Sequence, residues 1–197
     1  MASLARQWMD EFWPVVSARD RADRLREAAL GNRLEAWTAA ATEAVVATCR
    51  VLGWDAVAKG SPSVVHPEAR EEFLGIDVTA FARVADCPWP FPIAAFELEN
   101  SRRDDRVGYS LWKVLSLRAP LRMVFAYRPA ADEGAALVED VASRVVGSLS
   151  LGDRTSLNGE TAIVIGNRSA GEVFPYDYFR MWILNTNTGR FIPAPGA

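Results

Sequence analysis

Apolar residues recur along the chain first at helical spacing and then in short, strand-like runs. Residues 1–30 and 33–52 have apolar positions three or four apart, which predicts two helical segments, the second closed by Gly53. Pro14 is expected to divide or kink the first of them. Apolar runs then predict three strands, at 54–58, 72–84 and 91–100.

The second half of the chain alternates between the two patterns. Helices are expected over 104–117 and 134–149, and strands over 121–127, 161–165, 179–184 and 190–192. Helices that alternate with strands in this way predict an α/β fold with a mixed sheet. The chain has 197 residues and 50% of them are hydrophobic, which fits one domain with a full core.

Composition and charge exclude several classes of protein. The net charge of −3 argues against bulk electrostatic coating of nucleic acid, although a local basic groove is compatible with it. No apolar run reaches the ~18 residues of a membrane-spanning helix, and no basic segment leads into an apolar stretch at the start. Cys49 and Cys87 are isolated thiols that fit a cytoplasmic location, with a bridge between them less favoured. The single histidine, His66, excludes His-rich zinc sites and is expected in a loop.

Three acidic residues lie on two neighbouring predicted strands. Asp77 interrupts an apolar run, and Glu97 and Glu99 end the next one, where residues two apart point to the same face. If the two strands pair, the three carboxylates converge and repel one another unless a divalent cation lies between them. Oxygen ligands favour Mg²⁺ or Mn²⁺. The alternative is that the glutamates face solvent and Asp77 pairs with an arginine.

The order of these features resembles the PD-(D/E)XK nuclease superfamily: an acid in an apolar strand, a turn, E-x-E on the next strand, and then a helix. The resemblance covers about residues 33–128. It implies a restriction endonuclease-like fold, with a mixed central sheet flanked by helices. The core would span 33–130, between an N-terminal helical extension (1–32) and a C-terminal helix and strands (131–197). Asp77 matches the first acid of the motif and Glu97 the second, whereas Glu99 stands where most members carry a lysine. Glu99 is a catalytic candidate with them, as a further ligand of the metal or as the group that positions the water.

A lysine on the following helix is the candidate replacement. The chain has twenty arginines but only two lysines, Lys59 and Lys113. Lys113 shares one face of the predicted helix with Tyr109 and Ser110. Because a lysine amine can be tuned by burial and arginine cannot, Lys113 can serve to orient or deprotonate water. The alternatives are a solvated helix lysine, or Lys59 in this role.

Other charged residues are candidates on weaker signals. The resemblance implies a glutamate on the first core helix near the metal, which would be Glu43, with Glu35 as the other option. Glu43 can also be a surface residue or a partner of Arg50. Phosphate contacts are expected from arginines that follow the acidic strand, namely Arg102, Arg103 and Arg106. Alternatively, Arg102 and Arg103 pair with the adjacent acids Asp104 and Asp105.

These features together predict a Mg²⁺- or Mn²⁺-dependent phosphodiesterase acting on nucleic acid, with DNA the favoured substrate. A second interpretation is a catalytically inactive restriction endonuclease-like domain that serves as a binding or assembly module. A glycosidase-type carboxylate pair is a third, and residues 1–30 are compatible with a docking arm in all three. Dimerisation is common in this superfamily, although no residue identifies a homodimer interface here.

Overall fold

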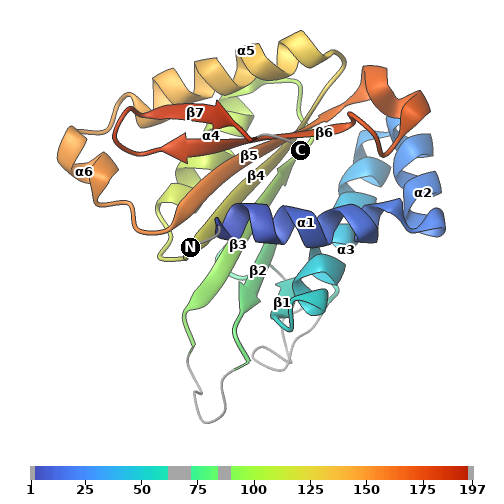
Figure 1. The fold of residues 1–197 in the computed structure, drawn as a ribbon, viewed down its shortest axis with the longest axis horizontal. Coiled ribbons are helices and arrows are strands. Elements are labelled where there is room, and N and C mark those ends of the chain that lie inside the picture. Colours follow the sequence, from blue (N-terminus) through green and yellow to red (C-terminus); the bar gives the residue numbers. More distant parts are fainter. Residues whose placement is uncertain (1–2, 62–71, 84–89, 195–197) are drawn as a thin grey trace.

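A computed structural model describes residues 3–61, 72–83 and 90–194, and it contains a seven-stranded mixed sheet with helices on both faces (Figure 1). The strands lie side by side in sequence order: β1 (Asp55–Ala58), β2 (Val78–Phe81), β3 (Pro92–Glu99), β4 (Leu121–Arg128), β5 (Glu160–Asn167), β6 (Phe179–Asn185) and β7 (Arg190–Pro193). The first three strands are antiparallel, β3, β4 and β5 are parallel, and the last two are again antiparallel. The predicted mixed sheet flanked by helices is confirmed.

The helices lie on both sides of this sheet. They are α1 (Leu4–Ser17), α2 (Arg19–Leu30), α3 (Leu34–Val51), α4 (Asp104–Leu115), α5 (Ala131–Val141), a π-helical turn η1 (Ala142–Val146), α6 (Leu151–Thr155) and a 3₁₀ turn η2 (Arg168–Val173). Helix α1 crosses the front of the sheet in Figure 1. None of the helices in the described ranges is both long and apolar enough to span a bilayer.

The first helix belongs to the main core. Trp8 and Phe12 of α1 are fully buried, and Trp8 lies 5.0 Å from the ring of Phe96 on β3. The N-terminus of α1 is fixed by Glu160 of β5, which accepts hydrogen bonds from the Ser3 hydroxyl at 2.6 Å and from two backbone amides at 2.9–3.0 Å. An acidic side chain there also complements the positive end of the helix dipole. The N-terminal segment therefore packs against the sheet instead of projecting from it.

The opposite face of the sheet is covered by α4, α5 and η1. Val107, Leu111 and Val114 of α4 pack against Val124 of β4 and Ile163 of β5. Helix α4 is the crossover between the parallel strands β3 and β4, which requires a connection that returns over one face of the sheet.

Side chains of β3 alternate between these two layers. Ala94, Phe96 and Leu98 belong to the core under α1 and α3. Alternation along a strand therefore turns the odd-numbered residues, including Glu97 and Glu99, toward the α4 side.

Two element predictions were wrong. The first helical segment breaks at Ala18, which has extended backbone angles, and Pro14 lies inside α1. Buried Val15 and Val16 hold the last turn of α1 against the core, so the missing amide of Pro14 does not end the helix. The expected strand over 72–84 is only the four residues of β2, because a tight turn precedes it. In that turn Leu74 and Gly75 have φ values of 54° and 68°.

Candidate active site

The pairing of β2 with β3 brings the first two predicted acids together. Val78 is opposite Phe96 and Thr79 is opposite Ala95, so one further step along both strands sets Asp77 opposite Glu97. The Asp77 Oδ2 atom accepts a hydrogen bond of 2.6 Å from the backbone amide of Leu98. This bond joins the residue that precedes β2 to the neighbouring strand and fixes the Asp77 carboxylate at the sheet.

Lys113 reaches this position from α4. Its Nζ atom lies 2.8 Å from Glu97 Oε1 and donates to the backbone carbonyl of Gly75, also at 2.8 Å. The side chains of Glu97 and Lys113 are 5% and 23% exposed, so this is a largely desolvated ion pair. The structure thus brings together Asp77, Glu97 and Lys113, which come from three separate segments of the chain.

Burial shifts the pKa values of both acids. Loss of water raises the pKa of Glu97 to about 7, and the nearby charge of Asp77 adds to this, while Lys113 and the Ser110 hydroxyl act in the opposite direction. Burial also raises the pKa of Asp77, against the effect of the hydrogen bond from Leu98. Near neutral pH the Glu97 carboxyl therefore exchanges a proton readily, as acid–base groups in active sites do.

Two buried oxygen atoms on this side of the sheet lack a hydrogen bond. Glu97 Oε1 contacts Lys113 as an ion pair outside hydrogen-bond geometry, and Thr79 Oγ1 has no partner among the described residues. Thr79 is 1% exposed, and it lies two residues after Asp77, so both side chains belong to the same face. An unpaired buried polar group costs about 1–3 kcal/mol, and this cost applies most clearly to Thr79, because Glu97 Oε1 still has the Lys113 ammonium at 2.8 Å.

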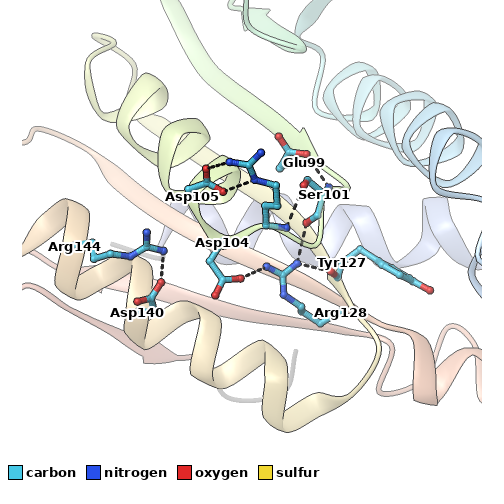
Figure 2. A network of polar contacts seen from close by, with 9 residues as sticks. Glu99, Ser101, Asp104, Asp105, Tyr127, Arg128, Asp140 and Arg144 are labelled. Carbon is cyan, nitrogen blue, oxygen red and sulfur yellow. Dashed lines mark hydrogen bonds and ion pairs between the residues drawn. The ribbon is translucent and has the colours of Figure 1, made fainter.

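Glu99 faces a different environment. Its Oε1 atom accepts a 2.7 Å hydrogen bond from the amide of Ser101, in the loop between β3 and α4 (Figure 2). Arg128, at the end of β4, donates to the Ser101 carbonyl at 3.1 Å and to Asp104 Oδ1 at 2.7 Å. This network fixes the loop and the start of α4, and it thereby helps to hold the Lys113 helix in place.

Glu43 lies outside the cluster. It forms an ion pair of 2.6 Å with Arg24 of α2, and both side chains are about half exposed. Arg50, the partner suggested by the sequence, donates instead to the hydroxyl of Ser61. Within the described ranges, no three His, Cys, Asp or Glu side chains gather closely enough to form a metal cluster of protein ligands alone.

The three predicted phosphate-binding arginines differ in their surroundings. Arg103 forms a two-point contact with Asp105, as one of the sequence alternatives expected, and Arg102 donates to the side chain of Asn32 at 3.1 Å. Arg106 is exposed and makes no ion pair with any residue that the structure describes. Of the three, only Arg103 is paired with an acid among the described residues, so the charges of Arg102 and Arg106 are both left for a ligand.

Sequence reasoning did not single out Thr79 or the Gly75 carbonyl. The period of two from Asp77 was the available signal for Thr79, whereas nothing in the sequence marks a backbone carbonyl as a lysine acceptor. His66 and Cys87 lie outside the described residues, and Cys49 is a buried thiol. Comparisons with models of known protein families, with curated proteins and with solved structures gave no match.

Proposed function

We propose that this chain is a metal-dependent phosphodiesterase that hydrolyses nucleic acid, with Asp77, Glu97 and Lys113 at its active site. The observation that carries the proposal is the 2.8 Å contact between Lys113 and Glu97, next to Asp77. A buried acid, Glu97, lies together with a half-buried acid and a half-buried amine from separate segments, although burial of charges destabilises a fold. Such clusters of perturbed acids and bases are typical of catalytic sites.

The order of elements supports the finer fold assignment as well. From α3 to β4 the chain runs helix, three antiparallel strands, helix and parallel strand, over the residues that resemble the PD-(D/E)XK superfamily. In this proposal the fold is restriction endonuclease-like, with Asp77 directly before the second strand of its core and Glu97 on the third. Lys113 on α4 supplies the amine that the Glu99 position lacks.

The donor set fits Mg²⁺ or Mn²⁺. Carboxylate oxygens of Asp77 and Glu97, with the unpaired hydroxyl of Thr79 on the same face, are hard oxygen ligands. Magnesium sites often use only one or two carboxylates and complete the shell with water and substrate phosphate, so Glu43 is not needed. A bound ion would polarise the scissile phosphate and lower the pKa of a bound water.

The residues of the chain then have separate roles. Asp77 is held by the Leu98 amide and Glu97 by the Lys113 ammonium, so both carboxylates are oriented before substrate arrives. Lys113 is held by the Gly75 carbonyl in turn, which directs its ammonium toward the acids, where it would orient the attacking water. Glu99 is engaged with the β3–α4 loop and is not part of this set.

The test is cleavage of single- and double-stranded DNA and RNA in Mg²⁺ or Mn²⁺. The variants are Asp77→Asn, Glu97→Gln and Lys113→Met, each checked for folding by circular dichroism. We expect each to lose activity by roughly 100-fold or more, because each removes a ligand or a proton-transfer group.

Two variants serve as matched controls. Lys59→Met removes the other lysine, which is exposed, and Glu99→Gln removes the charge two residues after Glu97. Both are expected to keep most of the activity. Equal losses in Lys113→Met and Lys59→Met, or full activity in folded Glu97→Gln, would contradict the assignment.

A catalytically inactive binding or assembly module is the second candidate. The specific observation in its favour is that the Lys113 ammonium already balances the negative charge of Glu97. Among the described residues the cluster therefore forms without a third protein carboxylate. Wild-type protein that cleaves none of the four substrates, and whose melting temperature does not rise with Mg²⁺ or Mn²⁺, would support the module over the enzyme.

A further inference from the structure

Helix α4 exposes two aromatic side chains beside the acidic cluster. Tyr109 and Trp112 are 54% and 55% exposed, and their rings stack with centroids 5.8 Å apart and planes 26° apart. The opposite side of the same helix buries Val107, Leu111 and Val114 against the sheet. The helix therefore needs neither ring for its own packing, and the ring faces form an apolar surface open to a ligand.

This aromatic pair is joined directly to the proposed active site. Lys113 Nζ lies 5.6 Å from the centroid of the Tyr109 ring, and the same atom lies 2.8 Å from Glu97 Oε1. A molecule that rests on the rings therefore extends to the acids without a large span. The ammonium over the Tyr109 ring is a cation–π contact that helps to hold the ring in place.

The charged residues of α4 next to the aromatic pair are positive. Residues 106–116 contain no acid, and the two acids that precede them are paired with Arg128 and Arg103. Arg106, one turn before Tyr109, has no ion-pair partner among the described residues. The exposed face of α4 thus combines flat rings with a free guanidinium, which complements a ligand made of bases and phosphates.

We propose that Tyr109 and Trp112 form a stacking surface for unpaired nucleobases, so that the substrate is single-stranded nucleic acid. This inference rests on the proposed phosphodiesterase function. In a duplex both faces of each base are covered by neighbouring bases, whereas an unpaired base can lie on an aromatic ring whatever its sequence. A strand stacked on the pair has its phosphates beside Arg106 and Lys113.

The test measures binding without divalent metal, in EDTA, so that it does not depend on cleavage. Fluorescence anisotropy gives the dissociation constants of the full chain for a labelled 12-nucleotide single strand, for its duplex and for an abasic strand of equal length. We expect the single strand to bind most tightly, because the abasic strand keeps the phosphates but lacks the bases. Trp112→Ala and Tyr109→Ala should each weaken it by roughly tenfold.

Matched variants separate stacking from a general loss of surface. Trp112→Phe should retain most of the affinity, and Tyr176→Ala, which removes an aromatic residue 74% exposed elsewhere, should have no effect. Equal affinity for the intact and abasic strands, or no change in Trp112→Ala, would overturn the proposal. So would binding of a second copy of the chain that Trp112→Ala abolishes, measured by light scattering.

The two proposals fail in different ways. If the protein binds single strands through Trp112 but cleaves none of the substrates, the stacking proposal stands and the phosphodiesterase proposal fails. If the protein cleaves in Mg²⁺ and Glu97→Gln loses this activity, but single strands and duplexes bind equally, the phosphodiesterase proposal stands. The stacking proposal then fails.

Discussion

Replacement of Glu97 by glutamine tests the electrostatics of the cluster apart from any activity. The carboxyl has a pKa of about 7 in the folded protein against an ordinary value of 4.5, chiefly because of burial. Glutamine has nearly the same shape and is neutral at every pH. The substitution therefore removes a single titration and leaves the packing close to unchanged.

The sign of the effect follows from proton binding. Below pH 4.5 Glu97 is protonated in both the folded and the unfolded chain, so its stabilising contribution is fully present there. Between pH 4.5 and 7 the folded state holds the proton more tightly, and that contribution is lost as the pH rises through this window. One pKa unit corresponds to about 1.4 kcal/mol, so the whole loss is on the order of 3 kcal/mol.

Glu97→Gln is therefore expected to be more stable than wild type at pH 8 and to lose that advantage by pH 4.5. The advantage at pH 8 has an upper limit of about 3 kcal/mol, because the glutamine also gives up the ion pair with Lys113. For a chain of this size the corresponding rise in melting temperature is at most roughly 10 °C.

The assay is urea unfolding followed by circular dichroism from pH 4.5 to 8, in EDTA. Only the difference between wild type and variant is used, because the raised pKa of Asp77 acts with the same sign in both. Glu99→Gln, two residues further along the same strand, is the matched control and should follow the wild-type curve. An unchanged pH slope in Glu97→Gln, or a variant less stable than wild type at pH 8, would refute the reasoning.

Three further predictions concern other parts of the molecule. Leu74→Asn should raise the free energy of unfolding by roughly 1 kcal/mol, because Leu74 is 70% exposed and its φ of 54° suits asparagine. An unchanged urea midpoint would contradict this. Glu160→Ala should lower the free energy of unfolding by about 1–2 kcal/mol, since it removes the acceptor of the Leu4 and Ala5 amides at the start of α1. Glu172→Ala, at an exposed ion pair, should change it by less than about 0.5 kcal/mol. Burial raises the pKa of the Cys49 thiol to about 12. In a Cys87→Ser background this thiol should therefore react with a thiol reagent at pH 8 only after unfolding. Rapid reaction of the folded protein would contradict this and show that the thiol is accessible.

The layer that α4 occupies could be predicted from its pattern of residues, but the strand before it could not. Apolar positions at Val107, Leu111 and Val114 define one buried side of α4 and leave Lys113 near its edge. The run over 72–84, in contrast, alternates like a strand throughout. Its turn depends on Leu74 with a positive φ, a conformation that leucine rarely adopts, and Gly75 is its one turn-forming residue, a weak signal inside an apolar run.

The orientation of α3 shows why Glu43 was misplaced beside the proposed metal site. Ala40, Ala41 and Ala44 are all buried, so small residues cover a wide part of the helix surface and the apolar pattern does not fix its rotation. The true rotation is set by packing against the sheet, which leaves Glu43 exposed and next to Arg24 of α2. The contacts of α3 with the sheet and with α2 carry this information, and the pattern of residues within α3 does not contain it.

Three features that each destabilise a fold meet on one side of this sheet. Leu74 holds a positive φ, the buried Thr79 hydroxyl has no hydrogen-bond partner among the described residues, and Glu97 is an acid buried deeply enough to have a pKa of about 7. The turn, the strand and the acid are joined because Lys113 contacts both the Gly75 carbonyl and Glu97. Well-packed apolar residues would stabilise this position better, and proteins keep strain and buried polar groups together mainly where a site needs them. Lys113 joins the strained turn to the buried acid, which favours a catalytic over a structural role and makes Lys113→Met the variant on which the proposed function depends most directly.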